Sequence, residues 1–494
     1  MRSPQRSAEE VLGLARAVYQ DDPEAAATID QLRRRLEEPL RVALVGSVKA
    51  GKSTLLNALL GERVAPTDAR ECTRIVTWYR YGATPSVRLF HRDGTSRTMP
   101  PRRQDERLEL DLADADVERI DRLEITWPSD LLRGLTLVDT PGTVSVSEDV
   151  SSLTDAFLMP EDGAASGADA VLYLLRSLHT SDVAFLRALH ERTRHGVSAV
   201  GAVAVLSRVD ELGAGRLGAM ISVNQAVEKL RNDPALAGVC ETVVPVAGLL
   251  GLGAATLRQS DFVALAQLEG VSRDRMRRLM ASPEFFIAAE DAELPTQQAR
   301  AGLVDRLGLY GIRLAMAVLR GGVRDAPDLA AELGRRSGFD ELRRVLDVNF
   351  VQRRVELKAH SVVLATLRLA RAQPAPGSDE VVARAEEHLA DAHAFREMQL
   401  IGRVVAERVA LDRAQLTELE RVIGGRGTAP HDRLGDESGA LDPRQLQELA
   451  VEHVRRWRAL AANPLLDRST VEACRVAVRS CEGVVAELAE LVPA

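Results

Sequence analysis

The chain has few aromatic residues, few cysteines and no long apolar run. Only 3% of its 494 residues are Phe, Trp or Tyr, and four are cysteine. A membrane-spanning helix needs about 18 or more consecutive apolar residues, and no stretch comes close to that. The first residues, MRSPQRSAEE, do not resemble an apolar secretion signal. We therefore expect a cytoplasmic protein without a transmembrane helix.

The cysteines also argue against a zinc site, because no two of them form a C-x-x-C pair. Cys474 and Cys481 lie seven residues apart in a predicted helix. We expect two buried reduced thiols there rather than a disulfide, as is usual in the cytoplasm.

The charge balance argues against nucleic acid as a partner. The 64 lysines and arginines and 72 aspartates and glutamates give a net charge of −8. A broad surface for RNA or DNA needs the opposite sign. Peripheral contact of a local basic face with anionic lipid is compatible with this charge.

Residues 41–61, RVALVGSVKAGKSTLLNALLG, contain the motif around which the chain is organised. A strand-like run precedes the phosphate-loop pattern G-x-x-x-x-G-K-S, and a helix-favouring run follows it. The glycines let several backbone N–H groups point at one phosphate, and the helix N-terminus adds positive charge. We expect Lys52 to reach the β- and γ-phosphates and Ser53 to bind Mg²⁺. The predicted nucleotide-binding residues are Gly46, Ser47, Val48, Lys49, Ala50, Gly51, Lys52, Ser53 and Thr54.

A second motif, Asp139-Thr140-Pro141-Gly142, follows an apolar strand-like run. We expect the Asp139 carboxylate to hold Mg²⁺ through a water and the Gly142 N–H to meet the γ-phosphate. The alternative is an ordinary Pro-Gly turn. A threonine hydroxyl from the polar loop before it could complete the magnesium shell, and by position alone Thr67, Thr73 and Thr77 compete for this role.

A third motif, Ser207-Arg208-Val209-Asp210, also follows a strand-like run. Aspartate here can accept hydrogen bonds from the N1–H and N2 amine of guanine, which adenine cannot offer, so Asp210 predicts GTP selectivity. Ser207 and Arg208 depart from the usual Asn or Thr followed by Lys. The alternative is a turn in which Asp210 caps a helix. After the next strand-like run, Ala247 is placed where a backbone N–H would contact guanine O6.

Strand-like runs alternate with helical segments up to about residue 255, which predicts a doubly wound, mostly parallel sheet. Each motif ends a strand, where ligands bind in such sheets. We also expect a hairpin from 75–80 and 86–90, and a helix over the acidic stretch 106–121. Later helices are expected at 339–371, 379–424, 443–461 and 467–490. Two helices within 5–38 should pack against the C-terminal ones.

These motifs, in this order, resemble those of the bacterial dynamin-like GTPases, and among them the mycobacterial isoniazid-inducible proteins. The likeness is carried by the phosphate loop, by the segment from Pro66 to Thr73, by LGLYG at 307–311 and by RSGFDELR at 336–343. The motifs cover about residues 40–250, and the helical remainder matches in pattern. The resemblance favours Thr73 over its two competitors.

The resemblance implies an α/β GTPase domain joined to an elongated α-helical neck and trunk bundle. The expected parts are N-terminal helices at 1–39, a dynamin-type GTPase domain at 40–330 and the neck and trunk at 331–494. GTP is the implied substrate, GDP and phosphate the products, and Mg²⁺ the cofactor. The implied catalytic groups are Lys52, Thr73 and Gly142, and the implied metal ligands are Ser53, Thr73 and Asp139.

The resemblance also implies assembly with itself or with a related dynamin-like protein. It further implies peripheral contact with the inner face of the cell membrane and a role in envelope maintenance under drug stress. However, the expected trunk tip near 372–378 carries no apolar loop that could insert into a membrane. A paired protein would then supply the membrane contact.

Two other functions are compatible with the motifs. Ribosome-assembly GTPases share the run G-K-S-T-L-L-N-A-L-L-G, but the acidic balance and the long C-terminal helices argue against that class. A nucleotide-binding regulatory subunit with little turnover is the second alternative. It arises because Val48 stands where dynamin-type loops usually carry a polar residue that orients the attacking water.

Lys49 follows Val48 at a corner where dynamins can use a monovalent cation. Our hypothesis is that the Lys49 ammonium supplies this charge instead, although the side chain could equally point to solvent. The hypothesis predicts equal GTP turnover in potassium, sodium and a bulky organic cation. Strong dependence on potassium would contradict it.

Overall fold

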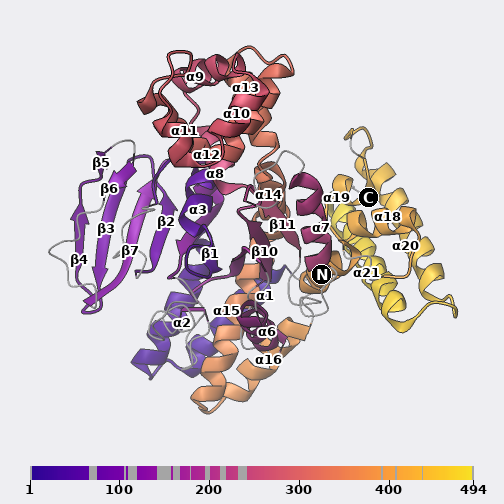
Figure 1. The fold of residues 1–494 in the computed structure, drawn as a ribbon. Coiled ribbons are helices and arrows are strands. Elements are labelled where there is room, and N and C mark those ends of the chain that lie inside the picture. Colours follow the sequence, from indigo (N-terminus) through magenta and orange to yellow (C-terminus); the bar gives the residue numbers. More distant parts are fainter. Residues whose placement is uncertain are drawn as a thin grey trace.

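The computed structural model describes residues 3–491 apart from 66–74, 105–106, 110–118, 142–156, 159–166, 178–179, 195–200, 212–218, 232–241, 391–392, 406–408 and 437. In this part of the chain a nine-stranded sheet has the order β11-β10-β9-β1-β8-β2-β7-β3-β4. Helices gather above, below and beside the sheet (Figure 1).

The five strands from β11 to β8 are parallel neighbours, as the sequence predicts. Their side chains alternate between two apolar cores. In β1, for example, Ala43 and Val45 face a core shared with α6 and α7, whereas Val42 and Leu44 face a core shared with α3 and α14. Burial on both faces explains why these strands read as continuous apolar runs. The bounds are β1 (Leu40–Gly46), β8 (Leu135–Asp139), β9 (Ala170–Leu175), β10 (Gly201–Ser207), β11 (Val243–Val246), α3 (Lys52–Leu60), α4 (Leu131–Gly134), α6 (Thr180–Arg194), α7 (Ala219–Arg231) and α14 (Phe339–Leu346).

The predicted hairpin is wrong. β2 (Thr77–Tyr81) and β3 (Ser86–His91) do not pair, because β7 (Ile120–Trp127) lies between them. β2 is antiparallel to β8 and parallel to β7, whereas β3 is antiparallel to β7 and to β4 (Ser96–Met99). The alternating burial of Ile120, Leu123, Ile125 and Trp127 fits a strand that packs one face on the core.

The helix expected over 106–121 is also wrong where the structure describes that stretch. Arg107–Glu109 forms β6, which pairs with β5 (Arg102–Gln104), and β7 begins at Ile120. The many charged residues in the sequence of this stretch resemble the polar face of a helix, which accounts for the error. Residues 110–118 lie outside the described part.

A helical layer covers the upper end of the sheet (Figure 1). It comprises α8 (Gly248–Ala255), α9 (Gln259–Glu269), α10 (Arg273–Leu279), α11 (Pro283–Ala288), α12 (Gln297–Arg320) and α13 (Ala326–Arg335). The glycines of this layer allow close packing. A Cβ at Gly253 would lie 2.5 Å from the carbonyl oxygen of Arg306, so α8 meets α12 almost backbone to backbone. Gly308, with φ 63° and ψ 173°, produces a kink in α12 that suits only glycine.

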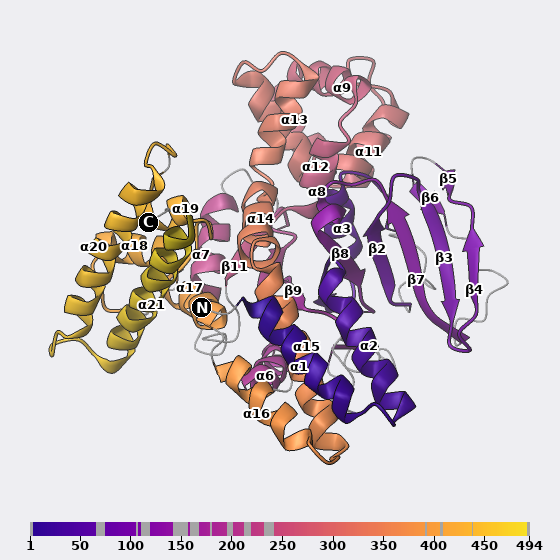
Figure 2. The same cartoon turned by 180° about the vertical axis from the view of Figure 1, so that it is seen from behind.

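The N-terminal helices pack against later ones, as predicted. α1 (Pro4–Val18) and α2 (Pro23–Glu37) share an apolar core with α15 (Arg354–Ala372) and α16 (Ser378–Ala390). This four-helix group, which we call the neck, lies below the sheet (Figure 2). The long helix expected from 339 to 371 is interrupted by a π-helical segment, Asp347–Val351, between α14 and α15.

The last helices form a separate lobe beside the sheet (Figures 1 and 2). It comprises α17 (His393–Val405), α18 (Arg413–Val422), α19 (Pro430–Leu434), α20 (Pro443–Ala461) and α21 (Arg468–Leu491). α20 and α21 match their predicted ranges. The single helix predicted over 379–424 is instead α16, α17 and α18, and α18 starts afresh at a capping box of Asp412 and Gln415.

Cys474 and Cys481 are buried and free in this lobe, as predicted. Burial raises the pKa of the Cys474 thiol to about 11 and that of Cys481 to about 12. Both therefore stay protonated and unreactive at neutral pH. The expected boundaries at 39/40 and 330/331 stay predictions, and we note that α13 runs through the second.

A buried ion pair joins the neck to the sheet. Arg35 at the end of α2 lies 2.7 Å from Asp169, which directly precedes β9, and both side chains are almost fully buried. The other carboxylate oxygen of Asp169 accepts a hydrogen bond from the backbone N–H of Arg41 in β1 (2.9 Å). Asp169 therefore fixes the start of the two central strands relative to α2.

We predict that Asp169→Ala lowers the free energy of unfolding by about 3–5 kcal/mol, because it leaves the Arg35 guanidinium buried without its carboxylate. Urea denaturation monitored by circular dichroism would measure this. Glu386→Ala, which breaks the exposed pair with Arg371, is the matched control and should cost less than about 1 kcal/mol. Equal losses in the two variants would contradict the role given to Asp169.

Candidate functional site

The loop between β1 and α3 is built on three residues with positive φ. Gly46 has φ 151°, and a Cβ there would lie 2.6 Å from the carbonyl oxygen of Leu174, so the loop leaves β1 tight against β9. Gly51 (φ 98°) precedes α3, and Lys49 (φ 64°) is a rare non-glycine in the left-handed region. The strained turn at Lys49 is held by an N–H···O bond from Ala50 to Ser47 (3.1 Å).

Lys52, the first residue of α3, folds back over this loop. Its ammonium group lies 3.0 Å from the carbonyl oxygen of Gly46 and 3.5 Å from that of Ser47. Burial lowers the pKa of Lys52, and the nearby Asp139 carboxylate partly offsets this. The cation is thus held at the centre of the loop, where a phosphate would replace the carbonyl groups as its partner.

Asp139 ends β8 opposite Leu44 of β1, and this register brings it to α3. Its Oδ2 atom lies 3.4 Å from the hydroxyl oxygen of Ser53, and its Oδ1 atom is buried without a hydrogen-bond partner. Burial raises the pKa of Asp139 to about 6, against the opposing effects of Lys52 and Ser53. A buried carboxylate with an unused oxygen beside a hydroxyl suits a hard divalent cation such as Mg²⁺.

Thr140 is a residue of this site whose role sequence reasoning missed. Its hydroxyl donates a hydrogen bond to the carbonyl oxygen of Leu44 (2.8 Å) and is buried. It therefore fastens the end of β8 to β1, directly beside Asp139. The signal was present in the D-T-P-G motif itself. The two other predicted catalytic residues, Thr73 and Gly142, lie outside the described residues.

Ser207 connects the third motif to the phosphate loop. Its buried hydroxyl lies 2.7 Å from the carbonyl oxygen of Ala50 and 3.0 Å from that of Leu175. A small hydroxyl at the end of β10 can therefore fix the loop to two neighbouring strands. This accounts for serine at a position where the usual pattern has Asn or Thr.

Arg208 adopts a left-handed conformation (φ 54°), and its guanidinium group pairs with Glu211 at 2.6 Å. Glu211 also pairs with Arg176 from the end of β9 (3.0 Å). Asp210, the carboxylate of the third motif, lies in the turn between Arg208 and Glu211. Burial raises the pKa of Asp210, and the charge of Arg208 opposes that effect. The turn therefore presents a half-buried carboxylate at the carboxyl edge of the sheet.

Tyr310 of α12, in the helical layer, responds to the charge of this carboxylate. The pKa of Tyr310 is raised by burial and then by the charge of Asp210. Tyr310 follows the Gly308 kink, so the LGLYG run positions it. Sequence reasoning used that run only as a family likeness and did not assign it to the site.

The structure does not support the predicted use of the Ala247 N–H. This N–H donates a hydrogen bond to the carbonyl oxygen of Ser337 (2.9 Å), and Ala247 is buried. The turn at Gly338 (φ 81°) packs directly on the end of β11, where a Cβ would lie 2.1 Å from the carbonyl oxygen of Pro245. The RSGFDELR run thus occupies the donor that sequence reasoning assigned to guanine.

Comparison with known proteins agrees with this arrangement. The model of the Dynamin family matches residues 42–195. The chain is 42% identical over 473 residues to the isoniazid-induced protein IniC of Mycobacterium tuberculosis, which covers 95% of this chain and 94% of IniC. It is 31% identical over 171 residues to IniA of the same organism (31% of this chain, 26% of IniA).

Two further matches are more distant. A bacterial dynamin-like protein of Nostoc punctiforme is 30% identical over 150 residues, or 28% of this chain and 20% of that protein. A solved structure of an oligomerised bacterial dynamin pair aligns with 99% of this chain and 74% of its own at 13% identity, with a TM-score of 0.36. The phosphate loop and the strand-end carboxylates agree with the alignment to IniC, which extends over nearly the whole length of both chains. The chain therefore belongs to the IniC family of dynamin-like GTPases.

Proposed function

We propose that this GTPase hydrolyses GTP at the loop 46–54 and couples turnover to assembly on a membrane, in envelope maintenance under drug stress. The observation that carries the proposal is the meeting of Lys52, Ser53 and Asp139 at the carboxyl ends of β1 and β8. These residues come from two motifs 86 positions apart in the chain, and only the strand register brings them together.

In this proposal the loop N–H groups and Lys52 bind the phosphates and absorb the charge that develops as water attacks the γ-phosphate. Ser53 and Asp139 would hold Mg²⁺, with Thr73 as the expected further ligand, and the metal would add positive charge at the β- and γ-oxygens. Gly142 would contribute its N–H to the γ-phosphate. Asp210, beside Arg208, would recognise the guanine edge.

The group that orients the attacking water is not supplied by Val48. Its side chain is 48% exposed and has no polar atom. The attacking water therefore needs another group, from this chain or from a second molecule. This requirement favours a GTPase whose turnover rises on assembly. A chain that binds GTP with little turnover of its own is the second candidate.

The drug-stress part of the proposal is supported by the relatives rather than by the site, because IniC and IniA are named as isoniazid-induced proteins. Assembly is supported by the water-orienting group that Val48 cannot supply. Among the described helices none is long and apolar enough to cross a bilayer. Any membrane contact through these helices would therefore be peripheral, with the anionic inner face as the proposed surface.

Vesicle binding tests this part of the proposal. The chain loaded with a non-hydrolysable GTP analogue should co-sediment with anionic vesicles and not with ribosomes. In a separate assay with GTP, the same vesicles should raise the turnover rate. A mixture with a related dynamin-like protein should be included, because the partner could carry the membrane contact. Co-sedimentation with ribosomes alone would favour the ribosome-assembly class and contradict the proposal.

Asp210→Asn should change the base preference. The variant loses an acceptor for the guanine N1–H and N2 amine, and each such bond to a charged group is worth about 1.5–3 kcal/mol. We expect GTP affinity to fall about 100-fold or more and xanthosine triphosphate to bind better than it binds the wild type. Fluorescent-nucleotide titration would measure both. Asp274→Asn, an exposed change on α10, should have no effect, and unchanged GTP affinity in Asp210→Asn would contradict the assignment.

Asp139 should make the nucleotide-free protein less stable as pH rises. Its native pKa of about 6 lies above the ordinary value of 3.8, so the native state binds the proton more tightly than the unfolded state. Stability from this group is present below about pH 4 and is lost by about pH 6, with a total of about 3 kcal/mol. In EDTA, Asp139→Asn should therefore melt above the wild type at pH 7 and alongside it at pH 4. A lower melting temperature at pH 7 would contradict this.

A further inference from the structure

A large cleft separates the neck from the C-terminal lobe. It has a volume of about 1390 Å³, and helices α1, α15 and α16 line one side while α17, α19 and α21 line the other. Pockets for small ligands usually measure about 300–1000 Å³. The cleft is thus larger than a metabolite needs and large enough for a short segment of protein. It lies away from the phosphate loop and takes no part in the site described above.

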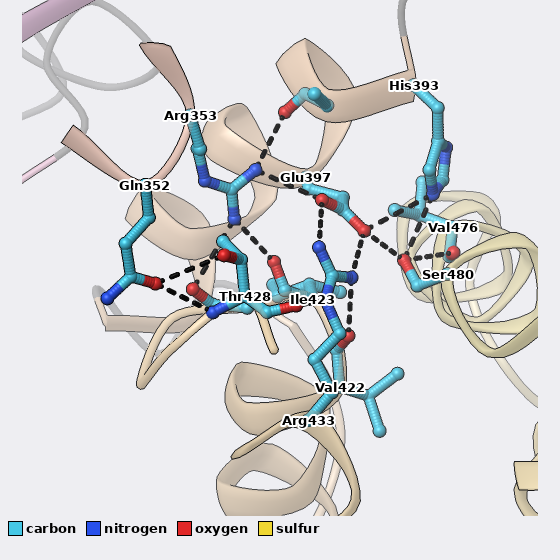
Figure 3. Close-up of polar contacts among 12 residues, drawn as sticks. Gln352, Arg353, His393, Glu397, Val422, Ile423, Thr428, Arg433, Val476 and Ser480 are labelled. Atoms are coloured by element: carbon cyan, nitrogen blue, oxygen red, sulfur yellow. Dashed lines mark hydrogen bonds and ion pairs between the residues drawn. The ribbon is translucent and has the colours of Figure 1, made fainter. Parts of the chain in front are cut away.

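The floor of the cleft is a buried polar network centred on Glu397 (Figure 3). The Glu397 carboxylate pairs with Arg353 at 3.0 Å and with Arg433 at 2.6 and 3.1 Å, and it accepts a hydrogen bond from Ser480 at 2.6 Å. His393 lies 3.4 Å away. Burial opposes ionisation, but Arg433, His393 and Arg353 together hold the pKa of Glu397 well below its usual range.

This network fixes the two walls of the cleft to each other. Arg353 stands at the start of α15 in the neck, whereas Glu397, Arg433 and Ser480 belong to α17, α19 and α21 of the lobe. A second Arg353 nitrogen donates to the carbonyl oxygen of Ile423 at 2.8 Å. The cleft is therefore a formed groove with a rigid floor rather than a loose gap between helices.

The lining of the cleft is acidic. It contains more glutamates than arginines, and the two arginines nearest Glu397 are already occupied by it. His360 adds no positive charge, because burial lowers its pKa to about 3. The seven glutamates are 10, 356, 380, 387, 397, 487 and 490, and the four arginines are 353, 384, 433 and 479. With the histidines neutral the lining carries a net charge of −3.

Four polar atoms on the floor are buried and have no hydrogen-bond partner: Nε of Arg353, Oε2 of Glu356, Nδ1 of His360 and Nδ1 of His393. Glu356 and His360 lie one turn apart on α15. A buried acceptor without a partner costs free energy that a donor from a ligand would recover. The carboxylate oxygen in particular would accept an N–H from a lysine or arginine side chain.

The walls leave room for a helix. On α21 the lining residues from Arg479 to Glu490 recur at spacings of three and four, and this face is roughly 16 Å long. Small residues stand in the opposing walls, and a Cβ added at Gly13 of α1 or at Gly483 of α21 would meet nothing within 4 Å. An amphipathic helix that lies in a groove between other helices is a recurring mode of protein recognition.

We propose that this cleft is the docking groove for a basic helical segment of a partner protein. Lysine or arginine side chains of that segment would pair with Glu356 on the floor and with Glu380, Glu487 and Glu490 on the walls. Charge complementarity selects a basic partner, and the volume and helical walls select a protein helix. The described residues include no group of three His, Cys, Asp or Glu that could hold a metal ion, so a metal is not the occupant we propose.

The probe is a fluorescein-labelled amphipathic lysine–leucine peptide of about 14 residues, roughly 21 Å long as a helix. Fluorescence anisotropy should show saturable binding to the full chain, and the same peptide with glutamate in place of lysine should not bind. Glu487→Gln/Glu490→Gln should weaken binding about tenfold. The matched control Glu448→Gln/Glu452→Gln, with the same charge change on an exposed face of α20, should change it less than twofold. Equal weakening in both double variants would overturn the proposal.

A second variant separates shape from charge. Gly483→Phe should block the groove without changing its charge, and a circular dichroism spectrum like that of the wild type would show that it folds. It should abolish peptide binding, and unchanged binding would overturn the proposal. Sedimentation velocity of the chain alone gives a further arm. Self-association that Gly483→Phe abolishes would make a second copy the occupant and overturn the assignment to a different protein.

Discussion

The parallel pairing of β1 with β8 and β9 is the constraint on which the site depends. It sets Leu44 opposite Asp139 and Gly46 opposite Leu174, so the phosphate loop and the second motif end at the same edge of the sheet. Thr140 stabilises the register at that edge through its hydrogen bond to Leu44. Asp169 stabilises it at the start of the strands through its hydrogen bond from Arg41. A slip of one residue would exchange the side chains that face the two cores and separate Ser53 from Asp139.

The turn that leads into α14 is attached at the same edge, so a change at the site can reach the helices that follow it directly. The turn at Ser337 and Gly338 docks on the end of β11, and α14 and α15 lead from there into the neck and the Glu397 network. Tyr310, after the kink at Gly308, is close enough to Asp210 for the carboxylate charge to raise its pKa, although burial has the larger effect. A nucleotide at this edge would therefore contact or adjoin the elements that carry the neck and the C-terminal lobe.

Sequence reasoning predicted the parallel strands and the phosphate-loop geometry because continuous apolar runs and positive-φ glycines leave local signals. It failed at β7, where the partner strand is distant in the chain and charged side chains cover the exposed face. It also failed at Ala247, since the Ser337 carbonyl that occupies its N–H comes from 90 residues further on. The Glu397 network was not predicted for the same reason, because its members lie on four separate helices.

Phosphate release from GTP by Lys52→Ala is the measurement that tests the central claim most directly. Lys52 is the buried cation at the centre of the loop. The account predicts that the wild type releases phosphate from GTP and not from ATP, and that Lys52→Ala abolishes this release, whereas the exposed change Lys229→Ala on α7 does not. Equal release by Lys52→Ala and the wild type would contradict the account.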